Sequence, residues 1–215
     1  MLIKPEIIFK NDSFIVLDKP AGLLSVRARG SLSSQKTAAD WAREFCKDAF
    51  IVHRLDMETS GLMIFARTEA AQRELSGLFE KKAVEKKYRA LVWGRVAENK
   101  GTIDRRIREF SSGRCAVDFD GKDCLTEYSV SERFKEATLL EVLPRTGRRH
   151  QIRVHLYSIG HPVVGDPLYG NTAINKKYPC LMLRAFSLNF EFGGEQFHFK
   201  APDERCFDLV ISLFR

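Results

Sequence analysis

Apolar residues cluster in short runs separated by turn residues along most of the chain, a pattern typical of β-strands. Asn11 and Asp12 lie between two such runs, and Gly193 and Gly194 lie between two others, so we expect a hairpin at each place. The run 61–66 is short and uniformly apolar, as in a fully buried strand. The strands predicted in this way cover residues 7–9, 14–17, 61–66, 88–93, 127–133, 138–143, 181–192 and 196–199.

Helical spacing of apolar residues distinguishes a second group of segments. Ile152, Leu156 and Ile159 recur at this spacing and should face inward. Thr68 is a residue type that favours a helix N-cap, and Asp203 is expected to cap the last helix. The predicted helices cover residues 37–45, 68–81, 148–159 and 203–213.

Strands outnumber helices and mostly follow one another in hairpins. This order predicts an α+β fold, with a mixed, largely antiparallel sheet and flanking helices. A length of 215 residues suits a single domain over residues 1–215, built as two lobes around a central cleft. Sixteen Phe residues supply enough apolar material for a core that needs no disulfide or metal.

The chain carries more basic than acidic residues, with 35 Lys and Arg against 28 Asp and Glu and a formal charge of +7. Such a surplus suits a polyanion partner, although a basic soluble protein without one has the same composition. The five cysteines are scattered, which argues against a zinc site and against a secreted disulfide framework. Residues 1–10 do not form a signal peptide, and no apolar run reaches the roughly 20 residues that span a bilayer. We therefore expect a reducing, cytoplasmic location.

The segment 53–61, with the sequence HRLDMETSG, places polar residues immediately before the predicted buried strand. Loops at strand ends often carry function, so Asp56 is a candidate catalytic carboxylate. The same residues would also suit an ordinary solvated loop whose Asp and Thr make turn hydrogen bonds. Motifs for nucleotide phosphates, dinucleotides, zinc proteases and serine hydrolases are absent from the sequence.

The segment 145–165 is strongly basic. No acidic residue lies between Glu141 and Asp166, so this charge predicts an anionic partner, unless the segment is simply a solvated helix face. Helical spacing places His150, Arg153 and Tyr157 on one stripe, which suits a phosphate, a base or a buried carboxylate. A second basic stretch, with a predicted loop over residues 28–35, suits an RNA clamp or an ordinary loop. Its basic residues are Lys19, Arg27, Arg29 and Lys36.

Four ordered motifs resemble those of the RluA family of pseudouridine synthases. They are Asp18–Val26, His53–Gly61, Lys86–Ala90 and Thr146–His155, the last followed by Gly160–Asp166. One position departs from the family pattern, because Arg184 stands between Leu183 and Ala185 where the family usually has His. The N-terminal RNA-binding module of some relatives does not precede these motifs.

The resemblance implies that the chain is an isomerase that converts specific uridines in structured RNA to pseudouridine without a cofactor or metal. It implies Asp56 as the essential carboxylate, which either attacks C1′ or abstracts a ribose proton. Arg153 would pair with Asp56, and Tyr88 would stack on the uracil. The implied RNA-binding residues are His53, Arg54, Leu55, Lys19, Arg148, Arg149, His150, Gln151 and Leu183. The expected partner is ribosomal RNA or a tRNA anticodon stem-loop, bound by a monomer that does not associate with membranes.

Two other classes of function fit parts of the sequence. A non-catalytic RNA-binding protein would tolerate replacement of Asp56. A glycoside-cleaving enzyme would use Asp56 and Glu58 as a carboxylate pair, which an extended segment would place on one side of the chain. Release of free uracil would indicate this last activity.

Overall fold

The computed structural model describes residues 4–27 and 35–215, which form two compact units. Unit 1 comprises residues 1–86 and 185–202, and unit 2 comprises residues 87–184 and 203–215. The chain passes from one unit to the other three times, within β5 (Glu85–Trp93), within β11 (Leu183–Phe192) and between Pro202 and Asp203. A single domain with a central cleft stays a prediction.

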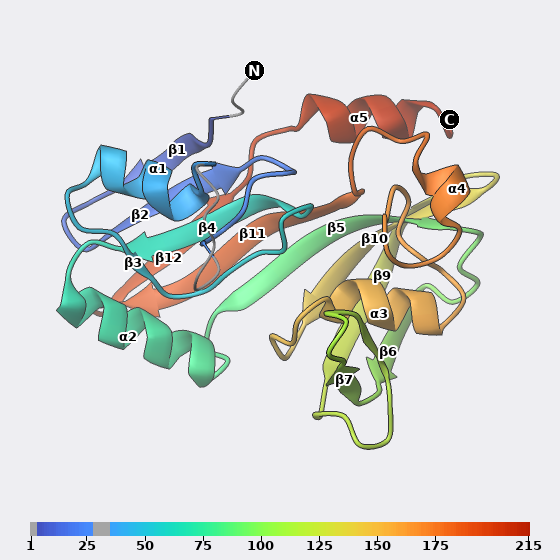
Figure 1. Ribbon diagram of the computed structural model, residues 1–215, viewed down its shortest axis with the longest axis horizontal. Coiled ribbons are helices and arrows are strands. Elements are labelled where there is room, and N and C mark those ends of the chain that lie inside the picture. The colour runs from blue at the N-terminus through green and yellow to red at the C-terminus, as the bar shows by residue number, and fades with distance from the viewer. Residues whose placement is uncertain (1–3, 28–34) are drawn as a thin grey trace. The chain divides into compact units, whose positions relative to one another are not determined.

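Unit 1 is a largely antiparallel sheet with two helices. Its strands follow the order β1-β2-β4-β11, with β3 paired to β4 and β12 paired to β11 (Figure 1). The helix α1 lies beside β2, and α2 lies beside β3 and β4. The bounds are β1 Glu6–Lys10, β2 Phe14–Lys19, α1 Ala38–Phe45, β3 Phe50–Ile51, β4 Ser60–Ala66, α2 Glu69–Glu80 and β12 Glu195–Lys200.

The strand β4 is the centre of unit 1, and all seven of its residues are buried. Its apolar side chains pack into a core with Phe14 and Phe190. Gly61 has a φ of +113°, and a Cβ atom there would lie 2.2 Å from the carbonyl oxygen of Ala185. Only glycine therefore allows the backbone of β4 to approach β11 so closely at this position.

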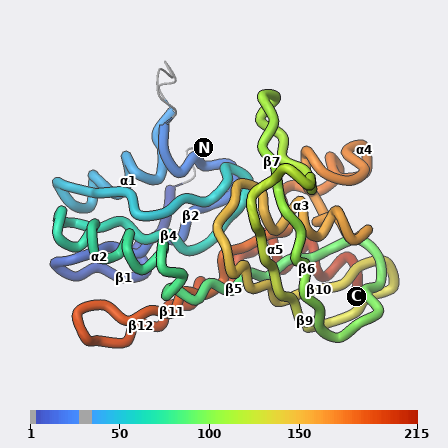
Figure 2. The backbone as a smooth tube through the Cα atoms, turned by 90° about the horizontal axis from the view of Figure 1, so that it is seen from below, coloured from blue at the N-terminus to red at the C-terminus, as the bar shows by residue number. Residues whose placement is uncertain are grey.

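Unit 2 contains four antiparallel strands in the order β5-β10-β9-β6. The helix α3 packs against β9 and β10 through Ile152 and Leu156, as predicted (Figure 1). A separate two-stranded hairpin of β7 and β8 projects from the unit (Figure 2). The bounds are β6 Lys100–Asp104, β7 Ile107–Glu109, β8 Cys115–Val117, β9 Leu125–Arg133, β10 Ala137–Pro144, α3 Gln151–Ser158, α4 Thr172–Asn175 and α5 Arg205–Ser212.

Most predicted elements are confirmed, as is the α+β class with a largely antiparallel sheet. The short elements β3, β6, β7, β8 and α4 were not predicted. The predicted cap at Asp203 is wrong, because the N-cap of α5 is Glu204 and it makes no side-chain cap. The predicted loop 28–35 lies outside the described residues except for Gln35.

The predicted helix 148–159 begins later than expected. Its N-cap is His150, whose φ of +54° is in the left-handed region, so the helix starts at Gln151. The predicted stripe of His150, Arg153 and Tyr157 is therefore wrong. Arg153 is fully buried, whereas Tyr157 is 50% exposed.

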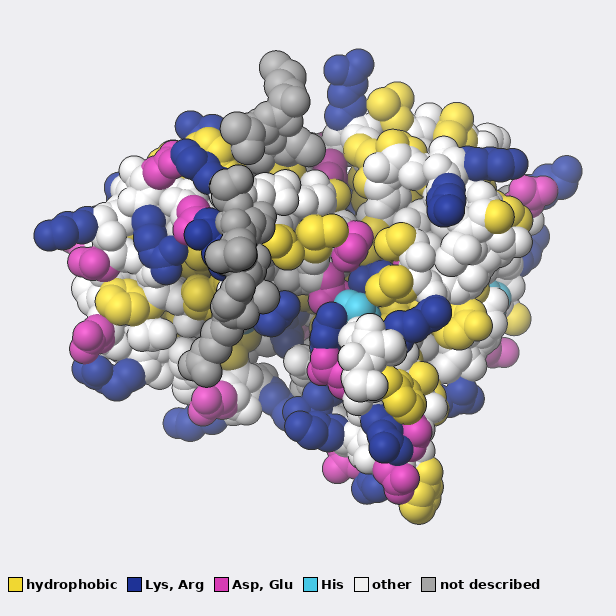
Figure 3. All heavy atoms as spheres, in the orientation of Figure 1, with side chains coloured by type: hydrophobic (Ala, Val, Ile, Leu, Met, Phe, Trp, Pro, Cys, Tyr) yellow, Lys and Arg dark blue, Asp and Glu magenta, His cyan; other side chains and the backbone are white. Residues whose placement is uncertain are grey.

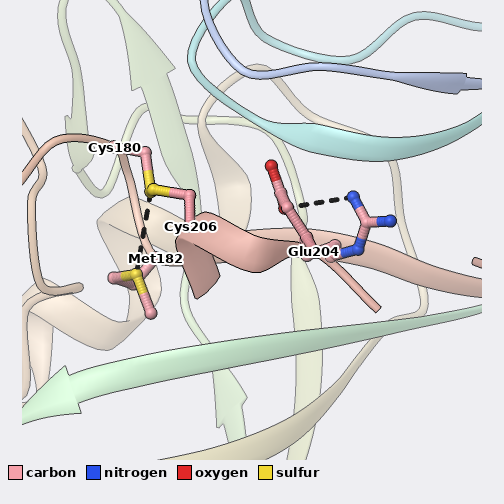
Figure 4. The surroundings of a disulfide bond; sticks show 5 residues. Cys180, Met182, Glu204 and Cys206 are labelled. Carbon is pink, nitrogen blue, oxygen red and sulfur yellow. Dashed lines mark hydrogen bonds and ion pairs between the residues drawn. A yellow bond between two sulfur atoms is a disulfide. The ribbon is translucent and has the colours of Figure 1, made fainter. Parts of the chain in front are cut away.

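Cys180 and Cys206 form a disulfide that joins the segment before β11 to α5 (Figure 4). The scattered positions of the cysteines did not predict this pair. Cys46, Cys115 and Cys124 are buried and carry thiols. Over residues 4–27 and 35–215, no helix is long and apolar enough to cross a membrane.

Candidate active site

The predicted site residues fall into two groups, one in each unit. Unit 1 contains Lys19, His53, Arg54, Leu55 and Asp56. The residues of unit 2 are Tyr88, Arg148, Arg149, His150, Gln151, Arg153 and Leu183. The proximity of Asp56 to Tyr88 or Arg153 thus stays a prediction from the sequence.

Asp56 is half-buried in a short turn, closed by a hydrogen bond from the Thr59 amide to the Asp56 carbonyl at 3.2 Å. The residues on either side of Asp56 are fixed by the first motif. The Ser25 hydroxyl donates to the Leu55 carbonyl at 2.6 Å and accepts from the Leu55 amide at 3.1 Å. The Gly22 amide donates to the Met57 carbonyl at 2.9 Å. The backbone that carries Asp56 is therefore held from both sides.

Lys19 is fully buried and belongs to the same arrangement. Its ammonium donates to the carbonyl oxygens of Pro20 at 3.0 Å, Leu23 at 2.7 Å and Met57 at 3.0 Å. An ammonium has three donors, and these carbonyls take all three. In this structure the ammonium of Lys19 joins the two loops, and its predicted contact with an RNA phosphate stays a prediction.

The side chain of His53 is held by contacts inside unit 1. Its ring stacks on Phe79 with 4.4 Å between centroids, and Nε2 accepts from the Ile64 amide at 2.9 Å. Burial, with a smaller contribution from the Lys86 charge, lowers the pKa of His53 to about 3. The imidazole is neutral at physiological pH as a result. Arg54, the next residue, is exposed, as an RNA-contacting side chain must be.

Arg153 lies on α3 and forms a bidentate ion pair within unit 2. Its Nε and Nη2 atoms each lie 2.8 Å from an oxygen of Asp166, and both side chains are fully buried. Asp166 Oδ1 also accepts from the amides of Leu168 at 2.8 Å and Tyr169 at 3.1 Å. The guanidinium of Arg153 thus has a fixed anionic partner that was not predicted.

Tyr169 joins this arrangement to His150. The Tyr169 hydroxyl lies 2.9 Å from His150 Nδ1 and accepts from the Cys115 amide at 3.1 Å. Asp166 stands in a motif that the sequence identified without assigning it a role, whereas Tyr169 lies just beyond that motif. Their proximity to Arg153 depends on tertiary structure and had no signal in the spacing.

Gln151 is buried and uses its full hydrogen-bonding capacity inside unit 2. Its Nε2 donates to the Leu125 carbonyl and to the Thr126 hydroxyl, each at 2.9 Å. Its Oε1 accepts from the Thr146 hydroxyl at 2.7 Å and from the Arg148 amide at 3.0 Å. Two donors and two acceptor positions are all that the amide has, so Gln151 holds segments of unit 2 together, and its predicted RNA contact stays a prediction.

Acidic side chains from elsewhere in the fold neutralise part of the positive charge of the basic segment 145–165. Arg145 pairs with Glu127 at 2.7 Å, and Arg149 pairs with Glu109 of β7. Arg148 is exposed, and its side chain donates to a backbone oxygen, that of Asp123, at 3.4 Å. Carboxylates from other segments thus neutralise much of the charge, and Arg148 is the stronger phosphate-contact candidate of the adjacent pair.

Carboxylates also neutralise basic residues of the second basic stretch, where the structure describes it. Arg27 pairs with Asp40 at 3.1 Å, and Lys36 pairs with Glu44. Arg29 lies outside the described residues.

At the projecting β7–β8 hairpin, basic side chains gather together with acidic and hydrophobic ones (Figure 3).

Tyr88 and Leu183 lie at the hydrophobic core of unit 2. Tyr88 is half-buried, pairs with Val142 in the sheet register and packs against this core. Leu183 is 3% exposed and is part of the core. Arg184, at the position where the family usually has His, forms an ion pair with Glu204 at 3.1 Å (Figure 4). The predicted contacts of Tyr88 and Leu183 with the base stay predictions.

The sequence and fold both match known proteins. Residues 13–158 match the family described as RNA pseudouridylate synthase. The chain is 37% identical to the dual-specificity RNA pseudouridine synthase RluA of Escherichia coli K12, over 91% of this chain and 92% of that protein. The RluA protein of Vibrio cholerae is also 37% identical, over 86% of this chain and 76% of its own length. The structure of human RNA pseudouridylate synthase domain containing 1 aligns with a TM-score of 0.82 and 26% identity, covering 100% of this chain and 96% of that chain. The chain therefore belongs to the RluA family of RNA pseudouridine synthases.

Proposed function

We propose that this protein isomerises specific uridines in structured RNA to pseudouridine, with Asp56 as the essential carboxylate. Family membership supports the reaction. The observation that supports Asp56 is the fixed backbone around it, where Ser25 holds Leu55 and Lys19 holds Met57. A reacting group must be held in position during catalysis, and these contacts do this without using the Asp56 carboxylate.

The reaction breaks the N1–C1′ bond, turns the uracil and forms a C5–C1′ bond, after which C5 loses its proton and N1 gains one. The Asp56 carboxylate is the reacting group, and it either attacks C1′ or removes a ribose proton. Arg153 pairs with the carboxylate, and Tyr88 stacks on the turned base and offers a hydroxyl for proton transfer. No cofactor takes part in this scheme, because the same uracil that is detached from C1′ at N1 is attached to it again at C5.

The proposed substrate is a folded RNA, either ribosomal RNA or a tRNA anticodon stem-loop. Relatives at 37% identity are named dual-specificity enzymes, and a relative from Nitrosomonas europaea is named ribosomal large subunit pseudouridine synthase D. That protein is 41% identical to the chain, and the match covers 50% of its length. We propose that the protein acts as a cytoplasmic monomer, as the sequence predicts.

The test uses RNA that carries uridine labelled with tritium at C5. Pseudouridine formation exchanges this label with water, so the protein should release tritium in proportion to the pseudouridine formed. Binding without release would support a non-catalytic RNA-binding protein. Appearance of free uracil would instead support glycoside cleavage by Asp56 and Glu58.

A further inference from the structure

The turn that begins at Asp166 is built around one buried carboxylate. Asp166 accepts four hydrogen bonds, two from Arg153 and two from the amides of Leu168 and Tyr169. The Asn175 side chain donates to the Asp166 carbonyl at 2.9 Å, which fixes the backbone as well. The turn therefore holds the Asp166 carboxylate in the one orientation in which it pairs with the Arg153 guanidinium.

Tyr169 places a second constraint on the same guanidinium. The Arg153 guanidinium lies over the Tyr169 ring, 5.3 Å from its centroid. The Tyr169 hydroxyl accepts from the Cys115 amide and shares a hydrogen bond with His150 Nδ1, so two groups hold the outer end of the ring. Burial raises the pKa of Tyr169, which keeps the phenol protonated. The ring is thus anchored and restricts the plane in which Arg153 can turn.

Stability alone is a poor reason for this arrangement. A buried ion pair contributes little net free energy of folding, because both charges lose their hydration. A bidentate pair does determine direction, because a planar guanidinium that is held through Nε and Nη2 must present Nη1 along one line. The arrangement is therefore better suited to aiming Arg153 than to stabilising unit 2.

We propose that Asp166 and Tyr169 are positioning residues, which fix the direction in which Arg153 presents its guanidinium to the reacting carboxylate and nucleotide. This inference rests on the proposed function. Asp166 acts only through Arg153, and Tyr169 limits the rotation of the same group. Neither residue touches the substrate.

The experiment is a double-mutant cycle between Asp166→Asn and Arg153→Lys, measured by single-turnover tritium release at saturating protein. Asparagine keeps the size of the side chain and its amide-accepting oxygen but loses the charge and one acceptor. We expect Asp166→Asn alone to slow the chemical step about 100-fold, as a misplaced catalytic group does, with RNA affinity within threefold of wild type. In the Arg153→Lys background, Asp166→Asn should slow it less than threefold further, because the group that it positions is already lost.

Two additions separate positioning from folding. Tyr169→Phe removes a single hydroxyl and should slow the step about fivefold, again without loss of RNA affinity. Glu127→Gln is the matched control, because it also replaces a carboxylate that pairs with an arginine of unit 2, and it should turn over at the wild-type rate. Thermal unfolding of every variant identifies any that fails to fold, in which case Tyr169→Phe decides.

Three outcomes would overturn the inference. They are a wild-type rate in Asp166→Asn, losses that multiply in the double mutant, and a loss confined to RNA affinity. An inactive wild-type protein would instead contradict the proposed function, so the two failures are distinguishable.

Discussion

The ammonium of Lys19 donates a hydrogen bond to the carbonyl of Met57, the residue that follows Asp56, at 3.0 Å. This contact joins the first and second motifs of unit 1, which are 38 residues apart at this point. It gives the first motif a physical role, because a buried lysine that satisfies three carbonyls fixes the loop on which the candidate carboxylate stands.

The first prediction concerns this lysine. Lys19→Met keeps the length of the side chain but removes one hydrogen-bond donor from each of three carbonyls, of which only that of Met57 keeps a second donor from the described residues, the Gly22 amide, so the free energy of unfolding should fall by about 3 kcal/mol. Turnover should fall as well, because the Asp56 loop loosens. Urea denaturation measures the first effect, with the exposed Lys47→Met of the same unit as the control. An unchanged unfolding midpoint would show that solvent or other groups satisfy these carbonyls equally well.

Asp56→Asn should abolish isomerisation and leave RNA affinity within about tenfold, that is ~1.4 kcal/mol. The carboxylate supplies the chemistry, and its negative charge does not attract phosphates. Tritium release and filter binding measure the two quantities. Glu58→Gln, a change of the same kind two residues away, should retain turnover. Substantial release by Asp56→Asn would remove this residue from the mechanism, and equal losses in both variants would favour a carboxylate pair.

RNA binding should weaken steeply as salt increases, and Arg148 should account for part of the slope. Arg148→Ala should reduce the dependence of log affinity on log salt by roughly 0.7 to 0.9, the value for one phosphate contact. Arg149→Ala should reduce it less, because Glu109 already pairs with Arg149. Arg73→Ala on α2 is a control in which an exposed, ion-paired arginine is lost from unit 1. Identical slopes for wild type and Arg148→Ala would exclude a phosphate contact at this side chain.

Stability should fall in mild acid because His53 is buried in its neutral form. The pKa of His53 is about 3 in the folded protein against 6.5 ordinarily, so protons bind the unfolded chain first. Its contribution is fully present above about pH 6.5 and is lost as the pH falls toward 3, by at most ~1.4 kcal/mol per pH unit. His53→Gln should flatten this dependence, whereas His198→Gln, at an exposed position of unit 1, should not.

Burial also lowers the pKa of His155, so part of the acid sensitivity should remain in His53→Gln. Chemical denaturation at several pH values gives the free energies of unfolding. If His53→Gln and wild type lose stability in parallel between pH 6.5 and 4, His53 is not buried as a neutral group.

The sequence predicted the elements better than the roles of the polar residues. Strands such as β4 and helices such as α2 have local signals, namely an apolar run and the Thr68 cap. The sequence did not reveal the internal hydrogen bonds of Lys19 and Gln151, because these bonds depend on carbonyls and hydroxyls from distant segments. An acid-free stretch of sequence likewise did not reveal that Glu109, Glu127 and Asp166 would pair with its arginines. The sequence shows where the charged residues lie along the chain, whereas the tertiary structure decides which of them form ion pairs.

The last prediction concerns the form of the RNA. We expect activity on a short stem-loop that presents the target uridine in or beside its loop, and little activity on the same uridine within an uninterrupted duplex. The target base must leave its stack to be reached, and a loop base loses less stacking and pairing than a paired one, where the cost is about a few kcal/mol. Arg54 and Arg148 are both exposed and come from different segments, which suits a folded RNA better than an extended strand.

The comparison uses three RNAs of equal length, namely a stem-loop, an unstructured strand and a perfect duplex, each with one labelled uridine. A single-turnover rate at saturating protein separates the chemical step from affinity. The stem-loop should react fastest. The duplex should be slowed by the base-opening cost, and a mismatch opposite the uridine should recover part of the rate because pairing is already lost. Equal rates on all three RNAs would show that RNA shape does not select the site. A preference for the perfect duplex would contradict the base-opening cost and would point to a ribosomal assembly as the substrate.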